Sequence, residues 1–263
     1  MSLKKLSAIV TALFCSNLST AKDIPVGIGV GVASVYEGSD QYMVVPDLVA
    51  EYAIETERLG VFAIGTHGLT WKYPITDHVK VGLIGSYMQG RKQEIGIEGH
   101  KNKDLQGMGN LKGAVTAGAE ISYSLKDHII YMNSMTALGG RDYGGVNVDN
   151  ATRIELGVNS HYTINELWGL DYHLSTRYVN KNYNQAYFGV TESQAAQTNF
   201  TAYSPGGGFK DVGALLGVHY KLSKKLFLGA KGGGYYLLGD AVDSSIVKQK
   251  YGLIAVTGLL YKF

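Results

Sequence analysis

One short stretch of the sequence has the residue types and spacing of a hydrolase. His173 and Ser175 are two residues apart, and Asp171 precedes them by the same interval. Residues two apart on an extended strand lie on one face, so a serine and a histidine at this spacing approach hydrogen-bonding distance. A serine nucleophile and its general base require that arrangement. The spacing therefore raises the hypothesis of a hydrolase that uses His173 and Ser175.

The other candidate motifs support neither a catalytic nor a metal site. No helical pattern follows Gly27-x-Gly29-x-Gly31, so this run is not a nucleotide-binding loop. Asp240 and Asp243 share a loop that contains no histidine, and they fit turn chemistry. Four histidines lack the spacing of metal ligands: His67, His78, His100 and His128. We therefore expect no enzyme activity, no cofactor and no metal.

Composition excludes nucleic-acid binding through charge and favours a β-protein. The chain has 24 Lys+Arg and 22 Asp+Glu, and removal of Lys4 and Lys5 with a leader leaves 22 against 22. A neutral chain exerts no strong electrostatic attraction on nucleic acid. The 35 Gly in 263 residues, roughly 13%, are nearly twice the usual share of about 7%. The 19 Tyr and the alternating apolar residues, without long helical patterns, predict an all-β fold.

Residues 1–21 have the organisation of a cleaved secretory signal peptide. Lys4 and Lys5 form a basic start, residues 6–18 are mostly apolar, and residues 19–21 supply the small side chains of a cleavage site. The apolar run is shorter than the roughly 20 residues of a spanning helix. Cys15 is the only cysteine, so the mature chain is predicted to contain no disulfide. We expect residues 22–263 to form a single domain.

The mature sequence contains about twelve segments with the alternation of β-strands. Apolar Val26, Ile28, Val30 and Val32, for example, alternate with glycine or alanine. Pro46 weakens one segment, because proline donates no hydrogen bond to a ladder. The segments are 26–35, 42–54, 59–66, 67–74, 78–89, 112–125, 128–139, 151–163, 168–179, 211–222, 225–238 and 249–263.

The lengths of the connections alternate along the chain. Tight polar turns near 55–58, 76–78, 126–127, 165–166 and 223–225 are separated by longer loops near 36–41, 90–110, 140–150, 180–210 and 239–248, with 66–68 as the exception. Short turns at one rim and long loops at the other are typical of outer-membrane barrels, whereas a β-sandwich has no reason to sort its loops in this way. We predict a closed, antiparallel, up-and-down transmembrane β-barrel of about twelve strands, with ten as the alternative. Both termini are expected in the periplasm of a Gram-negative bacterium.

The polar face of each strand must then point into the barrel lumen, because charges facing lipid are costly. This reasoning predicts a lumenal polar network of Arg153, Glu155, Asp171, His173, Arg177 and Lys231. His173 and Ser175 belong to the same polar face, whereas a lipid hydrolase must meet its substrate on the apolar face. We therefore favour a lumenal hydrogen-bond network over catalysis, and the hydrolase stays the less favoured alternative.

Three segments give the chain a resemblance to the MltA-interacting protein (MipA)/OmpV family of outer-membrane proteins. They are Tyr36-Glu37-Gly38-Ser39-Asp40, Tyr187-Phe188-Gly189-Val190-Thr191 and the segment from Leu238 to Ser244, followed by an aromatic carboxyl terminus. Ser245 departs from the proline that the family often has there. The resemblance implies an outer-membrane barrel that acts as a scaffold, holding a murein-cleaving lytic transglycosylase near a bifunctional murein synthase. Other members are described as osmotically regulated or adhesion-related.

The predicted short turns offer a partner only a small surface. Their candidate contact residues are Lys126, Glu166, Lys224 and Lys225, and a standard interface needs about 800 Å² per partner. The long loops 90–110 and 180–210 face the other way and suit an adhesin. A narrow pore with small, weakly selective currents is the remaining alternative, since about twelve strands enclose less space than the 16–18 of porins.

The last strand carries the expected assembly signal. Leu259, Tyr261 and Phe263 share one face at the carboxyl end and resemble the signal read by the barrel assembly machinery, the other expected partner besides outer-membrane lipid. We predict that deletion of Phe263 impairs assembly, which is measured as loss of the heat-modifiable band on gels. Normal folding and yield without Phe263 would contradict the prediction.

Overall fold

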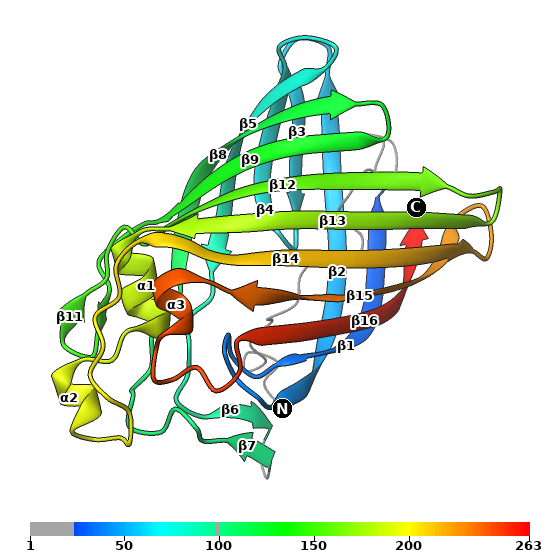
Figure 1. The fold of residues 1–263 in the computed structure, drawn as a ribbon. Coiled ribbons are helices and arrows are strands. Elements are labelled where there is room, and N and C mark those ends of the chain that lie inside the picture. The colour runs from blue at the N-terminus through cyan, green and yellow to red at the C-terminus, as the bar shows by residue number, and fades with distance from the viewer. Residues whose placement is uncertain (1–23, 98–99) are drawn as a thin grey trace.

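The computed structural model describes residues 24–97 and 100–263, and in it twelve strands form one closed barrel (Figure 1). The expected signal peptide, residues 1–21, lies outside the described residues. Each strand pairs antiparallel with its neighbours, and β1 pairs with β16 to close the cylinder. The barrel strands are β1 (Pro25–Ser34), β2 (Tyr42–Thr56), β3 (Gly60–Gly65), β4 (Gly68–Pro74), β5 (Val79–Met88), β8 (Ala114–Leu125), β9 (His128–Ala137), β12 (Thr152–Thr163), β13 (Trp168–Val179), β14 (Gly208–Lys221), β15 (Leu226–Leu237) and β16 (Tyr251–Lys262). The predicted fold class and strand number are confirmed.

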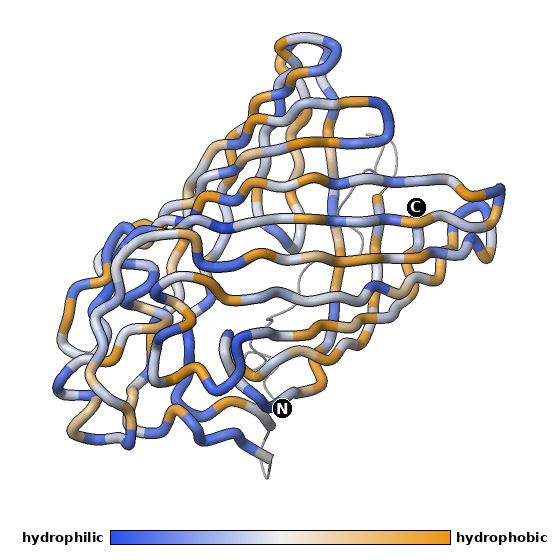
Figure 2. The backbone as a smooth tube through the Cα atoms, in the orientation of Figure 1, coloured by the Kyte–Doolittle hydropathy of each residue, from blue (hydrophilic) through white to orange (hydrophobic). Residues whose placement is uncertain are grey.

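Apolar side chains cover the outside of the barrel, whereas the inside contains glycines, polar residues and some buried apolar residues such as Val45 and Leu260. Along the strands, hydrophobic and hydrophilic residues alternate (Figure 2). On β1, Val26, Ile28, Val30 and Val32 are exposed on the outer face. Gly31 points inward, where an added Cβ would lie 2.8 Å from Cγ2 of Val256. The inward glycines therefore let neighbouring strands approach, and the outer valines form a surface suited to lipid.

The closing ladder joins the two ends of the described barrel. Its register runs from Pro25 opposite Lys262 to Ala33 opposite Ile254. A free strand edge in lipid would leave backbone amides and carbonyls without partners. The β1–β16 ladder removes such an edge from this part of the wall.

One hairpin is much shorter than the others. β3 and β4 are joined at Thr66 and His67, so β3 ends opposite Glu51, the middle of β2. Residues 42–49 of β2 consequently pair only with β1. The Thr66 N–H donates to the Ala50 carbonyl at 2.9 Å. Alternate residues of a strand direct their backbone polar groups to the same side, so those of Leu48, Pro46 and Val44 also point toward the β3 side of β2.

Pro46 is therefore compatible with β2, contrary to the doubt that the sequence raised. The strand runs without interruption over Tyr42–Thr56. On the β3 side of residue 46 no strand is paired, and proline has no N–H to leave unsatisfied there. Proline in a strand is found at such edges, and this one faces the opening above the β3–β4 hairpin.

The two rims of the barrel differ as predicted. One carries the turns 57–59, 75–78, 126–127, 164–167 and 222–225, and we call it the short-turn rim. The other carries loops 35–41, 89–113, 138–151, 180–207 and 238–250, which together form the cap. The cap contains the small hairpins β6 (Ile95–Ile97) with β7 (His100–Asn102) and β10 (Asp142–Tyr143) with β11 (Val146–Asn147).

The cap also contains three helices, although the sequence indicated only loops there. They are α1 (Lys181–Phe188), α2 (Glu192–Ala195) and α3 (Gly239–Val242). Asn180 caps α1 by accepting a hydrogen bond from Tyr183 N–H, and Thr191 with Gln194 forms a capping box on α2. Among the described residues, no helix is long and apolar enough to cross a membrane.

The outward face of β1 gives a test of membrane depth. Replacement of Val30 with Arg places a charge facing lipid near the middle of the strand and should destabilise the barrel by about 2–4 kcal/mol, whereas Val26→Arg near the short-turn rim should cost about 0–1 kcal/mol. Both side chains are exposed on the same face of the same strand. Urea unfolding in lipid vesicles measures the difference, and equal costs at the two positions would contradict this placement.

Candidate functional site

The three segments that carry the family resemblance meet in the cap, although they lie far apart in sequence. The Tyr36 hydroxyl donates to the Ile246 carbonyl at 3.2 Å. Ser244 Oγ donates to the carbonyl of Phe188. The N–H groups of Lys248 and Gln249 both donate to the Gly38 carbonyl, at 2.8 and 3.0 Å. Segments 187–191 and 238–244 are therefore hydrogen-bonded to each other. Segment 36–40 bonds to residues 246–249, which follow the third segment, and Tyr36 packs beside Val190 at the long-loop end of the lumen.

Gly38 and Tyr36 show why this junction needs particular residues. Gly38 has φ +94°, and an added Cβ would lie 2.7 Å from Cγ2 of Val247, so only glycine fits both the backbone and the space. Tyr36 is buried beside Leu105, Met108, Val190 and Ile246. Burial, reinforced by the nearby charge of Asp104, raises the pKa of the Tyr36 hydroxyl, which stays neutral and acts as a hydrogen-bond donor.

A salt bridge adds a further connection between cap loops. Lys248 Nζ lies 2.8 Å from Asp104 Oδ2. Burial acts to raise the pKa of Asp104, but hydrogen bonds from Lys248 and Asn102 outweigh it and hold the pKa below its ordinary value. The carboxylate therefore stays charged, and loop 89–113 is tied to loop 238–250.

Below this junction, the cap is fixed to the barrel wall by four charged residues. On β14, Asp211 Oδ1 accepts a hydrogen bond from Arg177 Nε at 2.7 Å, and Arg177 NH2 lies 2.7 Å from Oδ2 as an ion pair. Lys210 Nζ lies 2.6 Å from Asp211 Oδ2 and 2.7 Å from Glu37 Oε1. Asp211 Oδ2 accepts no well-aligned hydrogen bond and is held by the two cations as charges. Both Lys210 and Asp211 are 0% exposed.

A β-bulge places two consecutive residues of β14 inside the barrel. The register between β13 and β14 shifts between Arg177, which pairs with Asp211, and Tyr178, which pairs with Phe209. Lys210 is the extra residue, and it turns inward together with Asp211. Its ammonium lies 5.8 Å from the ring centre of Tyr183 and 5.9 Å from that of Phe188, within cation–π range.

A second polar group lies deeper in the lumen. The Tyr131 hydroxyl donates to Glu155 Oε1 at 2.6 Å, and His173 Nδ1 lies 2.6 Å from Asn159 Oδ1. Arg153 belongs to this level and has a buried Nε without a hydrogen-bond partner. His173 is therefore engaged with Asn159, and the structure gives the pairing of His173 with Ser175 no support as a nucleophile and base.

The structure places a different serine beside a histidine. Ser160 Oγ is hydrogen-bonded to His128 Nδ1, and the Tyr172 hydroxyl lies 3.0 Å from the same nitrogen. This group lies on the outer face near the short-turn rim. Ser160 is fully buried beneath its neighbours, so its oxygen cannot meet a substrate, and the group satisfies polar atoms at the surface of the barrel.

A third polar group lies near the short-turn rim and contains side chains with the donor types of a metal site. Nδ1 of His161 lies 2.7 Å from Asp171 Oδ1, and Nδ1 of His219 lies 3.2 Å from Oδ2. Their ligand atoms all lie within 4.8 Å of one another. The two imidazole rings are stacked 11° apart at 5.0 Å, so their lone pairs are parallel instead of converging on one ion. The geometry fits a carboxylate held by two imidazole N–H groups better than a metal centre.

The six predicted lumenal residues lie at successive heights of the lumen, and Glu155 is directly opposite Arg177 on the neighbouring strand. Arg177 belongs to the group at the cap, Arg153, Glu155 and His173 to the middle level, and Asp171 to the level near the short-turn rim. Lys231 also faces inward. Its side chain lies over Gly217 of the neighbouring strand, where a Cβ added to the glycine would be 3.3 Å from Lys231 Cε. Sequence reasoning missed the partners Glu37, Lys210, Tyr131, Asn159, His161 and His219. Cross-strand register is the signal that finds His161, which lies directly opposite Asp171.

The remaining predicted residues lie at the surface. Lys126, Glu166, Lys224 and Lys225 are exposed on the turns of the short-turn rim. Leu259, Tyr261 and Phe263 are exposed on the outer face, with the rings of Tyr261 and Phe263 4.7 Å apart.

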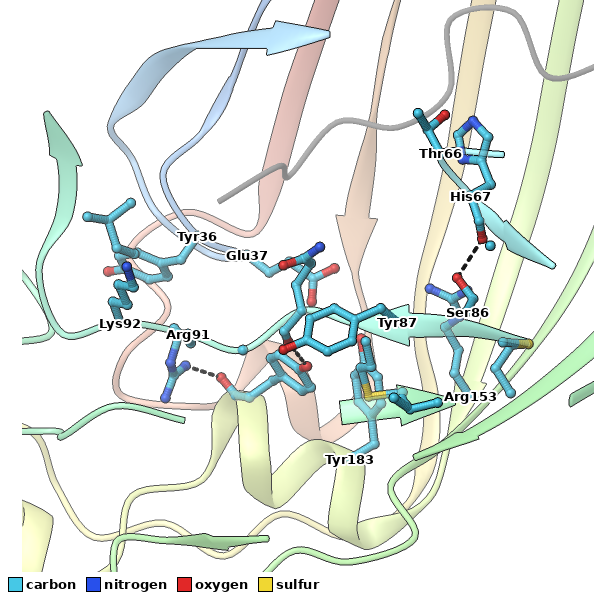
Figure 3. A pocket seen from close by; sticks show the side chains of 18 of the residues that line it. Tyr36, Glu37, Thr66, His67, Ser86, Tyr87, Arg91, Lys92, Arg153 and Tyr183 are labelled. Carbon is cyan, nitrogen blue, oxygen red and sulfur yellow. Dashed lines mark hydrogen bonds between the residues drawn. The ribbon is translucent and has the colours of Figure 1, made fainter. Parts of the chain in front are cut away.

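A cavity of about 1290 Å³ lies between the cap and the barrel interior (Figure 3). Tyr183 and Tyr187 of α1 line it from the cap, and Arg153, Glu155 and His173 line it from the lumen. Tyr183 also packs against Ala114, Ala137, Ala151 and Val179 at the ends of four barrel strands. α1 therefore covers this end of the lumen instead of leaving an open axial channel.

Comparison with known proteins identifies a family. A family model described as MltA-interacting protein MipA matches residues 26–263. Among solved structures, the NanC porin is 10% identical with a TM-score of 0.46, covering 90% of this chain and 100% of its own. An outer membrane channel from Pseudomonas putida F1 is 11% identical with a TM-score of 0.46, covering 96% of this chain and 100% of its own. No curated protein sequence matches the chain.

The buried charges at the cap give a stability test. Asp211→Leu leaves Lys210 and Arg177 without their shared anion and should destabilise the protein by about 3–5 kcal/mol. The double variant Lys210→Met/Asp211→Leu should cost less than the sum of the two single changes, because the uncompensated charges are removed together. Lys101→Met is the control, since it breaks the exposed Lys101–Glu94 pair and should cost under about 1 kcal/mol. Additive costs in urea unfolding would contradict this account.

Proposed function

The chain belongs to the MltA-interacting protein MipA family, and from that membership we propose that it is a non-catalytic scaffold. It is a β-barrel protein of the outer membrane of a Gram-negative bacterium. The proposed scaffold binds a murein-cleaving lytic transglycosylase and keeps it near a murein synthase. The observation that carries the proposal is the family match over residues 26–263, which spans the whole barrel.

The short-turn rim is the proposed docking surface, and we assign it to the periplasm. Two of the turns are hydrogen-bonded to neighbouring strand ends, because Lys221 N–H donates to the Leu167 carbonyl and Lys262 N–H to the Lys225 carbonyl, both at 2.8 Å. Each turn is too small for an interface of about 800 Å² per partner, so the partner must contact several turns at once. Exposed Lys126, Glu166, Lys224 and Lys225 supply charges for that contact.

The alternatives receive less support from the site. We do not propose an axial pore, because α1 and its buried neighbours cover the long-loop end of the lumen. An adhesin would use the outer surface of loops 90–110 and 180–210, yet the aromatic residues Tyr183, Tyr187 and Phe188 are turned into the cap. Hydrolysis by His173 and Ser175 lacks the pairing that it requires.

Leu259, Tyr261 and Phe263 keep their proposed role in recognition by the barrel assembly machinery. Their outward, exposed side chains are available to a partner before the strand is surrounded by lipid. This role concerns assembly of the barrel and is separate from scaffolding.

Charge reversal on one turn tests the docking surface. We predict that Lys224→Glu/Lys225→Glu weakens capture of a purified MltA-type lytic transglycosylase by at least about tenfold, because rim charges steer and orient association. The measurement is a pull-down with the folded mature protein at fixed salt.

The matched control is Lys103→Glu/Lys181→Glu, which reverses two exposed lysines of the cap and should leave capture unchanged. Deletion of residues 183–203 with intact turns separates the two rims. Loss of capture on that deletion, with no loss on reversal at the turns, would place the partner at the cap and refute docking at the short-turn rim.

A further inference from the structure

The barrel wall has an opening above the short β3–β4 hairpin. Residues 42–49 of β2 form one side of it and residues 86–88 of β5 the other, because neither segment has a partner from β3 or β4. The turn Gly65–Gly68 forms its lower edge. We call this opening the window. Because β3 and β4 do not reach this height, β2 and β5 are separated there by about three strand spacings of about 4.8 Å each.

The lower edge of the window is a tightly fixed turn. Gly68 has φ +115°, and an added Cβ would lie 2.1 Å from the Gly85 carbonyl oxygen. Ser86 Oγ donates to the His67 carbonyl at 2.7 Å. The hairpin is thus built to end at this height, and the window is a defined feature of the wall.

The window lies within the apolar part of the outer surface. Val44, Leu48 and Leu69 around it are exposed apolar side chains, and Tyr42 and Tyr87 are exposed at the cap ends of their strands. Aromatic residues at strand ends mark the boundary of the apolar band in membrane barrels. With the cap outside the cell, the window opens toward the outer leaflet of the membrane.

The cavity beneath the cap is continuous with the window. Its lining includes Thr66, His67 and Ser86 at the window and outward-facing Val44 and Leu69 beyond it. The same cavity is lined by Asn133 and Arg153 in the lumen. Its volume of about 1290 Å³ exceeds the roughly 300–1,000 Å³ of ordinary small-molecule pockets. It therefore connects the lumen with the lipid-facing surface.

The cap end of the cavity carries Arg91 and Lys92, whereas the carboxylates there, Glu37 and Glu94, are paired with Lys210 and Lys101. Arg91 is only 7% exposed, and its guanidinium donates to neutral groups, the Tyr187 carbonyl and the Tyr143 hydroxyl, the latter at 2.8 Å. Lys92 beside it is exposed. Figure 3 shows Arg91 and Lys92 on one side and Thr66, His67 and Ser86 on the other, with Tyr87 between them.

Within residues 24–97 and 100–263, no carboxylate forms an ion pair with Arg91. A buried cation without a counter-charge is costly, and an anionic ligand would offset that cost. The apolar side chains Met43 and Met88, at the cap ends of β2 and β5, line the same cavity between Arg91 and the lower edge of the window. The cavity therefore offers a buried cation at its cap end and apolar side chains toward the window.

We propose that this cavity binds a single-chain anionic amphiphile that enters sideways from the outer leaflet through the window. Its anionic headgroup lies at Arg91 and Lys92 beneath the cap, and its chain passes Met43 and Met88 to leave by Val44 and Leu69. The proposal stands apart from scaffolding, because it uses the opposite end of the barrel and no residue of the short-turn rim.

The test uses a lysophosphatidate with a diazirine on the chain carbon nearest the headgroup. The mature protein is reconstituted in phosphatidylcholine vesicles with this probe and irradiated, and labelled residues are identified by mass spectrometry. We expect labels on the cavity-lining residues Met88 and Met135 as well as on the outer surface. Labels confined to outward-facing side chains would overturn the proposal.

A sealed window provides the second measurement. Thr66→Trp/Ser86→Trp fills the window and should lower cavity labelling at least about tenfold, while labelling of outward Leu216 on the opposite wall stays unchanged. Leu216→Trp is the matched control and should leave cavity labelling as it was. Gel migration before and after heating ensures that only folded variants are compared. Undiminished cavity labelling with the window filled would contradict entry by this route.

The headgroup preference provides the third measurement. A lysophosphatidylcholine that carries the same diazirine should label the cavity several-fold less than the lysophosphatidate. Arg91→Gln/Lys92→Gln should remove that difference, whereas Lys103→Gln elsewhere in the cap should keep it. Equal labelling by both probes in the unsubstituted protein would refute recognition of the anionic headgroup.

Discussion

Lipid offers no hydrogen bonds, and this constraint governs most of the structure. Every backbone amide and carbonyl inside the apolar band must find its partner within the chain. Closure by the β1–β16 ladder satisfies the requirement around most of the wall. The exceptions are the stretches of β2 and β5 above the short hairpin, and on β2 Pro46 removes one donor from the unpaired side. The position of this proline and the opening in the wall are thus two aspects of one local arrangement.

The interior follows a different rule, because charges there must be compensated by other side chains or by water. The polar groups occupy three levels, and the level nearest the cap ties a loop residue, Glu37, to wall residues Lys210, Asp211 and Arg177. Glu37 also belongs to one of the three segments that meet above it. Cap and wall are therefore coupled through a few buried charges, and the cap is part of the folded structure instead of a set of loose loops.

Much of the barrel could be predicted from the sequence, because each strand carries its own alternating pattern and each turn its own polar residues. The sequence showed the connection at 66–68 as the exception to the alternation of short turns and long loops. The opening above it could not be predicted, because it depends on how far β2 and β5 extend beyond that connection. Lys210 could not be assigned to the interior, since a bulge breaks the two-residue period there. The pairs of His161 with Asp171 and of Glu37 with Lys210 depend on register and loop closure, which no local pattern encodes. Helix α1 did have a local signal, the Asn180 cap, but it lay within a segment read as a loop.

The β1–β16 ladder also has a consequence for the time course of folding. Val26 lies opposite Tyr261, so this pairing joins residues separated by almost the whole described chain. The other ladders of the barrel join strands that follow one another along its wall, and these local contacts carry a smaller entropic cost of loop closure. An open, curved sheet with β1 and β16 as its free edges is therefore the natural precursor of the cylinder. Joining those edges is the slow, non-local event, and until it occurs the precursor exposes two edges that can pair with another chain.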